Sequence, residues 1–275
     1  MLKQRIITGL LLAAAVLAAL LWLPPRELVI VLGLATLVAC WEWTDLAGLS
    51  SVPGRLAFCA ATAGAMVALW FYTQLGAELP EPRRIRALLS IAALWWCVAW
   101  VGVKTFPSSA RWWGAVGVRL AMGWLVLLPA WLACAYLRMQ NDGEWKILFL
   151  LCLVAAADIG AYFSGRRFGR HKLAPAVSPG KSWEGFWGGL LASVVLAALI
   201  WRLYWEEVAL VSLLIVAALT VLASVLGDLL ESMVKRYRGV KDSSNLLPGH
   251  GGVMDRLDSI SAAAPVFALG LLLAL

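Results

Sequence analysis

Residues 207–231 read EVALVSLLIVAALTVLASVLGDLLE, an apolar run with few polar residues before Gly227 and Asp228. A helix needs about 20 mostly apolar residues to cross the hydrocarbon core of a bilayer, so this run predicts a membrane-spanning helix. Segments of the same character lie on both sides of it, at roughly 5–23, 27–49, 56–74, 86–103, 116–137, 145–164, 184–202 and 259–275. We therefore predict an all-α, polytopic integral membrane protein with about nine transmembrane helices.

The composition supports this class and excludes two others. Only 14% of the 275 residues are charged and 62% are hydrophobic, whereas globular domains carry roughly 25% charged residues. A water-soluble enzyme is excluded because so few charged residues could not cover its surface with polar groups. A disordered chain is excluded because disorder needs low hydrophobicity and high charge. The net charge of +7 favours anionic lipid or a phosphorylated substrate, and no nucleic acid is predicted as a partner. The cysteines lie in apolar runs without C-x-x-C spacing, so neither a disulfide framework nor a zinc site is expected.

Charge distribution predicts the orientation and the division of the chain. Lysine and arginine are enriched in the N-terminal segment and in alternate loops, which places the N-terminus in the cytoplasm by the positive-inside rule. We predict a transmembrane scaffold over 1–140 and a transmembrane catalytic part over 141–275. The catalytic part would have cytoplasmic loops at 165–183 and 232–258 and a polar cavity open to the cytoplasm. The sequence leaves the roles of Glu42, Asp45 and Arg119, within the scaffold, open.

The first dense polar stretch runs from Asp158 to Glu184 and contains the triplet Gly180-Lys181-Ser182. This triplet is similar to the end of a phosphate-binding P-loop, but that motif needs a glycine at position 175, where the chain has Pro175. A turn that presents backbone N–H groups, Lys181 and a hydroxyl just before a helix still favours an anion at the helix N-terminus. The first stretch therefore predicts a phosphate site without a P-loop.

Other charges of this stretch allow two interpretations. Asp158 lies inside an apolar span, where a charge costs about 2.5 kcal/mol or more, so we interpret it as functional. The alternative is a residue near a helix end that reaches water. Arg166 and Arg167 fit a substrate site and a lipid-headgroup anchor equally well.

The second polar stretch, residues 227–259, holds as many acidic as basic side chains, which suits a site for a divalent cation and phosphates better than a simple lipid-binding patch. They are Asp228, Glu231, Asp242, Asp255 and Asp258 against Lys235, Arg236, Arg238, Lys241 and Arg256. On a helix Asp255 and Asp258 share a face, and Asp228 lies near the end of the preceding span. Carboxylates from two helix ends can converge on Mg²⁺, which takes oxygen ligands and completes its shell with water and substrate phosphates.

The segment Pro248-Gly249-His250-Gly251-Gly252 predicts a flexible turn whose glycines let the backbone approach a ligand closely. His250 stands between glycines and has no apolar face to pack against, so we interpret it as a site residue. The alternative for the whole stretch is a solvated, salt-bridged loop, which leaves its density of glycine and aspartate unexplained.

From Ser232 to Asp258 the chain resembles the phosphatidate cytidylyltransferase (CDP-diacylglycerol synthase) family. The family signature is Ser-x-x-Lys-Arg, four residues, Lys-Asp, small and apolar positions, Pro-Gly-His-Gly-Gly, two residues and Asp-Arg-x-Asp, and it is unbroken here. Asp158-Ile-Gly-Ala-Tyr and Ser178-Pro-Gly-Lys-Ser-Trp-Glu-Gly also resemble family elements, so the detailed likeness covers about 158–258. Two departures, Ser244 for a common glycine and Ser182 for a usual threonine, keep a small or hydroxyl side chain.

This resemblance implies transfer of CMP from CTP to phosphatidate, giving CDP-diacylglycerol and pyrophosphate, with Mg²⁺ as cofactor and K⁺ beside it in some members. It also implies a homodimer in the cytoplasmic (inner) membrane of a bacterium. Asp228 and Asp255 would bind the metal and act in catalysis together with Lys241, His250 and Arg256. Residues expected to bind phosphate or nucleotide are Ser178, Lys181, Ser182, Ser232, Lys235, Arg236 and Asn245, and those expected to support them are Asp158, Glu184, Asp242 and Asp258.

Both substrates of that reaction are polyanions, so positioning and charge neutralisation would account for most of the catalysis. No general base is obligatory, because a phosphate monoester is already ionised at neutral pH.

One alternative function is that of a CDP-alcohol phosphatidyltransferase, whose Asp-Gly-x-x-Ala-Arg motif is not matched at Asp142-Gly143-Glu144-Trp145. The others are an ion-coupled transporter, which should show interrupted spans in both halves, and a lipid-binding scaffold without turnover.

Overall fold

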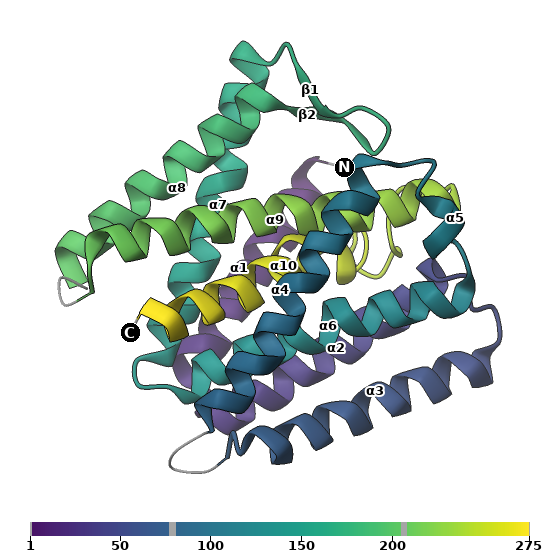
Figure 1. Ribbon diagram of the computed structural model, residues 1–275, viewed down its shortest axis with the longest axis horizontal. Coiled ribbons are helices and arrows are strands. Elements are labelled where there is room, and N and C mark those ends of the chain that lie inside the picture. The colour runs from purple at the N-terminus through teal and green to yellow at the C-terminus, as the bar shows by residue number, and fades with distance from the viewer. Residues whose placement is uncertain (1, 77–80, 205–207, 275) are drawn as a thin grey trace.

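The computed structural model describes residues 2–76, 81–204 and 208–274, and most of them are helical (Figure 1). The long helices are α1 (Leu2–Trp22), α2 (Pro25–Leu46), α3 (Val52–Thr73), α4 (Pro82–Lys104), α6 (Val116–Met139), α7 (Gly143–Phe168), α8 (Trp183–Tyr204), α9 (Leu210–Arg238) and α10 (Met254–Ala274). The short elements are helix α5 (Ala110–Trp113) and strands β1 (Lys172–Ala174) and β2 (Ser178–Ser182). Within the described ranges, eight helices are long and apolar enough to cross a membrane, and Ile6–Trp22 of α1 forms a shorter apolar helix. The all-α, polytopic fold predicted from the sequence is confirmed.

Several helices extend further into the polar stretches than the sequence predicted. Helix α7 continues to Phe168, α9 continues to Arg238 and α10 already begins at Met254. The predicted loops 165–183 and 232–258 are therefore too long, and the second one is reduced to residues 239–253. Helix α9 ends where Gly239 adopts a left-handed conformation (φ 69°). A glycine in the left-handed conformation commonly ends a helix. Charged residues on an exposed turn do not end one.

The segment 178–182, predicted as a turn before a helix, is strand β2 and leads directly into α8. It pairs with β1 in an antiparallel hairpin, with Lys172 opposite Ser182 and Ala174 opposite Ser178. The turn lies instead at residues 175–177. Backbone pairing with β1 thus determines the conformation of this segment.

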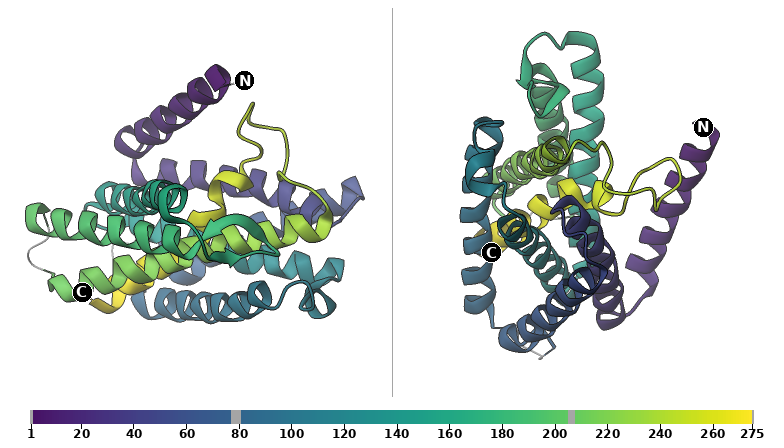
Figure 2. Two further views of the ribbon diagram at one scale, coloured as in Figure 1. Left: turned by 90° about the horizontal axis from the view of Figure 1, so that it is seen from above. Right: turned by 90° about the vertical axis from the view of Figure 1, so that its right-hand side faces the viewer.

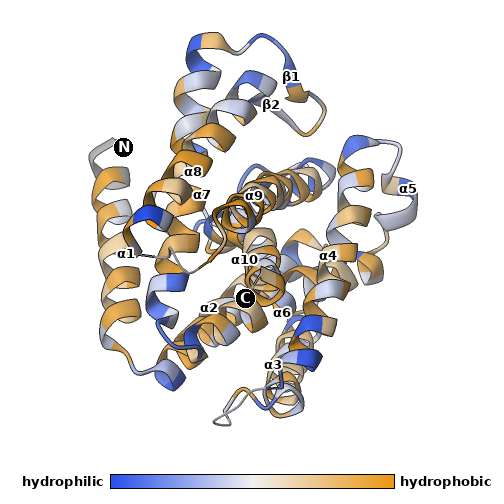
Figure 3. Cartoon of the chain, turned by 60° about the vertical axis from the view of Figure 1, so that its left-hand side comes forward, coloured by the Kyte–Doolittle hydropathy of each residue, from blue (hydrophilic) through white to orange (hydrophobic). Residues whose placement is uncertain are grey.

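Glu184, in the first turn of α8, fixes the base of the hairpin. Its carboxylate accepts a hydrogen bond from the backbone N–H of Arg170 at 3.1 Å and lies 2.7 Å from Nδ1 of His171. Helices α7 and α8 with this hairpin form an arm on one side of the bundle (Figure 1). Hydrophilic residues gather on the hairpin and at helix ends, whereas apolar residues cover most of the helices (Figure 3).

Helix α10 lies in the middle of the bundle, packed against α9, α6, α4 and α7 (Figures 1 and 2). Its consecutive residues Ala262, Ala263 and Ala264 are fully buried, as is Phe267. Asp255, in the first turn of α10, is 7% exposed, so this carboxylate must find its partners inside the bundle.

Helices α7 and α8 pack through small residues. A side chain added at Gly160 would lie 2.7 Å from the backbone oxygen of Gly188, and one at Gly189 would overlap the backbone oxygen of Ala157. Small residues at helix contacts let backbones approach closely, which is a common way for helices to associate in membranes. This contact holds α7 and α8 together as one arm.

Replacing Gly189 by leucine is expected to lower stability by about 1–3 kcal/mol, the usual cost of overpacking, because the side chain has no space against α7. Unfolding by denaturant in detergent measures this loss. The matched control is Gly64→Leu in α3, because a side chain at Gly64 meets nothing within 4 Å. Equal stability of the two variants would contradict the close α7–α8 contact.

The C-terminal end of α2 is held by the buried Arg119 of α6. Nε and Nη2 of Arg119 donate to the backbone oxygen of Ala47 at 3.0 and 2.8 Å, and Trp43 Nε1 donates to the backbone oxygen of Arg119 at 2.8 Å. These bonds satisfy a carbonyl that a helix end otherwise leaves unpaired. Asp45, by contrast, is exposed, and its Oδ1 lies 3.8 Å from Arg55 Nη1. Such a long surface ion pair contributes little to stability.

Candidate active site

An ion pair joins the hairpin to α9. Nζ of Lys181, on β2, lies 2.6 Å from Oδ2 of Asp228 on α9. Ser232, one turn further along α9, donates from its hydroxyl to Oδ1 of Asp228 at 3.1 Å. The side chains of Lys181 and Asp228 are 27% and 28% exposed, so this pair is accessible to a ligand.

Asp255, in the first turn of α10, is buried with both carboxylate oxygens engaged. Oδ1 accepts a hydrogen bond from Lys235 Nζ at 2.6 Å. Oδ2 accepts from the backbone N–H groups of Ser243 and Gly252 at 2.8 and 2.7 Å and lies 2.9 Å from the Ser243 hydroxyl. Lys235 Nζ is also 2.7 Å from Oε2 of Glu231. Lys235 thus links a carboxylate of α9 to a carboxylate of α10.

The two ion pairs belong to one cluster. Asp228, Glu231 and Lys235 follow one another at intervals of three and four residues, so they share one face of α9. Helix α10 packs closely against α9, because a side chain at Gly227 would overlap the backbone oxygen of Asp258. The structure therefore places Asp228 and Asp255 on neighbouring helices, and Lys235 joins Glu231 of α9 to Asp255 of α10.

Further charged residues face the same cluster. Asp258 interacts electrostatically with Asp228 and Lys181. Asp158, on α7, interacts electrostatically with Lys181, Asp228 and Arg256. The two polar stretches of the sequence thus meet in one place, and the charged residue inside the α7 span has partners there.

Carboxylates outnumber cationic groups in this cluster, which holds Asp158, Asp228, Glu231, Asp255 and Asp258 against Lys181, Lys235 and Arg256. Glu231 is 1% exposed, and its Oε1 has no hydrogen-bond partner among the described residues. A buried polar oxygen without a partner lowers the stability of the fold. A bound cation would take such carboxylate oxygens as ligands and would also balance the excess of negative charge.

The donor set fits Mg²⁺, which prefers oxygen ligands. In the described part of the chain, no group of three His, Cys, Asp or Glu side chains is arranged to hold a metal ion. Mg²⁺ is often held by one or two carboxylates, with water and substrate phosphates as its other ligands. The accessible carboxylate of Asp228 suits this mode of binding, whereas both oxygens of Asp255 already accept hydrogen bonds from Lys235, Ser243 and Gly252.

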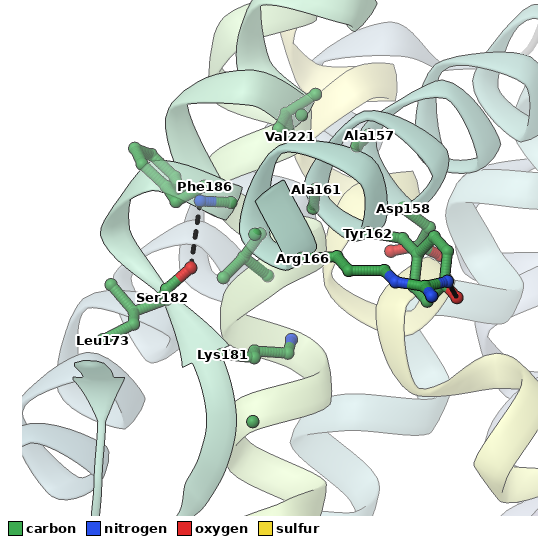
Figure 4. Close-up of a pocket in the computed structure, with 15 residues that line it drawn as sticks. Ala157, Asp158, Ala161, Tyr162, Arg166, Leu173, Lys181, Ser182, Phe186 and Val221 are labelled. Atoms are coloured by element: carbon green, nitrogen blue, oxygen red, sulfur yellow. Dashed lines mark hydrogen bonds between the residues drawn. The ribbon is translucent and has the colours of Figure 1, made fainter. Parts of the chain in front are cut away.

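A cavity of about 390 Å³ opens beside the Lys181–Asp228 pair, between α7, α8, α9 and the hairpin. Its polar lining includes Asp158, Arg166 and Lys181, and Val221 and Val225 of α9 line its apolar part. Figure 4 shows Lys181 and Arg166 along its border, with Arg166 near Tyr162; Nη1 of Arg166 lies 3.1 Å from the Tyr162 hydroxyl. A cavity with cationic and apolar walls suits a phosphate attached to an apolar group.

The loop 239–253 connects α9 to Asp255 and depends on its glycines. Gly251 has φ +83°, a conformation that other residues rarely adopt. A side chain at Gly252 would overlap the Ser243 hydroxyl and lie 2.6 Å from Oε2 of Glu42. The glycine motif identified in the sequence therefore allows close packing of the loop around two carboxylates, those of Asp255 and Glu42.

The other predicted site residues fall into two groups. Three lie exposed on the loop, namely Lys241, Asp242 and Asn245. The other four make contacts within the protein. Ser178 lies in the hairpin, and the Ser182 hydroxyl accepts a hydrogen bond from Gly185 N–H at 3.1 Å. Nε of Arg236 donates to the Val177 backbone oxygen at 3.2 Å, and His250 lies against Gly9 of α1. Nδ1 of His250 is buried without a hydrogen-bond partner in the described part of the chain. Their roles toward substrate stay predictions.

Sequence reasoning did not assign Glu42, Glu231 and Ser243 to the site. Glu231 was detectable, because it lies three residues after Asp228 on the same helix face. Glu42 gave a weaker signal as an acidic residue at the end of an apolar span. Ser243 gave none, because its importance comes from a contact between its hydroxyl and two distant carboxylates.

The fold and the cluster define a polytopic membrane protein with a partly buried, highly charged site that suits phosphorylated ligands. The chain belongs to the cytidylyltransferase family, whose family model matches residues 3–274. It is 48% identical to the phosphatidate cytidylyltransferase of Pseudomonas aeruginosa over 269 residues, which cover 98% of this chain and 96% of that relative. It is 42% identical to the enzyme of the same name from Haemophilus influenzae, with 98% of both chains covered, and 32% identical to that of Mycobacterium bovis, with 98% and 89% covered.

Proposed function

We propose that this protein is a phosphatidate cytidylyltransferase, which converts CTP and phosphatidate to CDP-diacylglycerol and pyrophosphate. Family membership and relatives that match almost the whole chain support this activity. The structural observation that carries the proposal is the assembly of Lys181, Asp228, Lys235 and Asp255 into one cluster beside a cavity with cationic and apolar walls. Neither the transporter nor the CDP-alcohol phosphatidyltransferase is favoured by these matches.

In the proposed reaction a phosphatidate oxygen attacks the α-phosphorus of CTP, the new P–O bond forms, and the bond to pyrophosphate breaks. Lys181 and Arg166 line the cavity, where they would attract and orient the phosphate groups. Cationic groups beside two polyanions reduce their mutual repulsion and stabilise charge on the departing oxygens. The enzyme needs no base at the attacking oxygen, which is already ionised.

Asp228 and Asp255 would hold Mg²⁺, with K⁺ beside it. When bound, Mg²⁺ supplies positive charge to the phosphate oxygens. Lys235 balances the charges of Asp255 and Glu231, and this keeps three charged groups in a fixed arrangement. Lys241, His250, Arg256 and Asn245 are the further residues that we propose to contact substrate.

The remaining parts of the proposal concern location and assembly. We place the protein in the cytoplasmic membrane of a bacterium as a homodimer, with its N-terminus and the site on the cytoplasmic side. The lysine and arginine bias of alternate loops supports this orientation. We also propose residues 1–140 as the scaffold and 141–275 as the catalytic part, because all eight charged residues of the cluster come from α7, β2, α9 and α10.

The purified protein, given CTP, phosphatidate and Mg²⁺ in detergent, is expected to form CDP-diacylglycerol and pyrophosphate in equal amounts. EDTA should abolish the reaction, and added Mg²⁺ should restore it, because the cluster's carboxylates need the cation to bind a triphosphate. Chromatography of labelled lipid measures the product. The absence of product over several lipid compositions and salt concentrations would reject the proposed activity.

A further inference from the structure

Glu42 binds the loop 239–253 although it lies about two hundred residues earlier in the chain. Its carboxylate is 3% exposed. Oε1 accepts hydrogen bonds from the Ser244 hydroxyl at 2.6 Å and from Val253 N–H at 3.0 Å. Oε2 accepts from Met254 N–H at 2.7 Å and lies 3.2 Å from the Ser243 hydroxyl. Among the described residues no ion pair includes Glu42, so its known partners all belong to the loop and the start of α10.

Two of these partners are N–H groups at the start of α10. The first N–H groups of a helix have no partner within the helix and need a capping acceptor. A carboxylate at this position is also favoured by the helix dipole. Glu42 therefore acts as a cap supplied by another helix, and its contacts fix where α10 begins.

The same contacts control the surroundings of Asp255. The Ser243 hydroxyl lies between Oε2 of Glu42 and Oδ2 of Asp255, at 3.2 and 2.9 Å. Gly252 donates its N–H to Asp255 and leaves no space for a side chain beside Glu42. The positions of Glu42, the loop and Asp255 are thus interdependent.

Helix α2 provides Glu42 with a fixed base. Trp43, the next residue, donates its indole N–H to the Arg119 backbone oxygen, and Arg119 binds the carbonyl of Ala47. The α2 end is consequently tied to α6 through Trp43 and Ala47, while Glu42 binds the loop.

We propose that Glu42 is a positioning residue: it clamps the loop 243–253 to α2 and thereby holds Asp255 in the orientation that the reaction needs. The role of Asp255 in this statement rests on the proposed function, whereas the clamp itself rests only on the contacts of Glu42.

The variant Glu42→Gln tests the proposal in the full-length enzyme. A glutamine keeps one acceptor oxygen and turns an NH₂ group toward either Val253 N–H or Met254 N–H, so at least one of these backbone hydrogen bonds is lost, while the neighbouring serine hydroxyl must reverse its role from donor to acceptor. Hydrogen–deuterium exchange should become faster at residues 243–254. The kcat/KM should fall about 10- to 100-fold, the usual effect of removing a partner that orients a metal ligand. The Mg²⁺ concentration for half-maximal rate should rise, and excess Mg²⁺ should recover part of the loss.

Asp45→Asn is the matched control, because Asp45 lies on the same helix and is exposed. It should leave both exchange and kinetics unchanged. Unchanged exchange in Glu42→Gln would overturn the proposal, and so would faster exchange with wild-type kinetics. An equal loss in Asp45→Asn would also overturn it.

Two milder variants keep the test valid if Glu42→Gln does not insert into the membrane. Glu42→Asp preserves the charge, and Ser244→Ala removes only the 2.6 Å bond to Oε1. Both should accelerate exchange of the loop to a smaller extent, and wild-type exchange in both would contradict the clamp. If the wild-type protein forms no CDP-diacylglycerol, the proposed function fails, while the exchange comparison still reports on the clamp.

Discussion

Replacing Asp255 by asparagine is expected to reduce CDP-diacylglycerol formation by at least about 100-fold, since even the outer partners of a metal ligand account for 10- to 100-fold. Oδ1 of Asp255 faces the Lys235 ammonium, and Oδ2 faces the N–H groups of Ser243 and Gly252. An asparagine NH₂ group meets a donor in either orientation. The variant therefore loses the charge that would bind Mg²⁺ and leaves a buried donor unpaired, which costs about 1–3 kcal/mol.

Initial rates over a range of Mg²⁺ concentrations measure this effect, with unfolding in denaturant to show that the variant is folded. Asp45→Asn makes the same chemical change at an exposed position of α2 and should retain full activity. A rate for Asp255→Asn within tenfold of the wild type at all Mg²⁺ concentrations would remove Asp255 from the metal site.

The second large effect is expected at the Lys181–Asp228 pair. Lys181→Met removes the ammonium that lies 2.6 Å from Oδ2 of Asp228 at the border of the cavity. Removing one group that stabilises transition-state charge usually costs about 10²–10³-fold in kcat. Asp228→Asn should cause a loss of similar size, because it removes a carboxylate of the proposed Mg²⁺ site and the partner of Lys181.

The double variant Lys181→Met/Asp228→Asn shows whether the two residues work together. Groups that act as a unit give strongly non-additive losses, so the double variant should be little slower than the slower single variant. Lys104→Met, at the end of α4, is the control for the loss of a lysine. Losses that multiply in the double variant would mean that the pair seen in the structure has no joint role.

Much of the fold was predictable from the sequence because a bilayer imposes a local rule. Each spanning helix must be apolar over its own length, since no water is present to bind exposed polar groups. The run 207–231 satisfies this rule on its own, and its residues 210–231 lie in α9; residue 207 lies outside the described part of the chain. The ends of the helices were less predictable. Helix α9 continues through Lys235 and Arg236 until Gly239, because charged residues do not break a helix at a polar membrane boundary.

The candidate site divides in the same way. Asp228, Asp255 and Lys181 were identifiable because the spacing of charged residues and glycines is a property of the chain itself. The side chains that contact these three residues were not identifiable from the sequence. The sequence predicts that Lys235 binds phosphate, and this stays a prediction; only the structure shows its pairing with Glu231 and Asp255, because α9 and α10 bring three charges together in a buried place.

The sequence by itself determined that the chain crosses a membrane several times and that its second half carries a dense set of charged residues. Hydropathy and residue spacing suffice for this, because both are read along the chain. Only the tertiary structure decided that residues 178–182 form a strand and that Glu42 of the first half caps α10. Strand pairing and helix capping depend on which segments meet in space, and that is set by packing of the whole bundle.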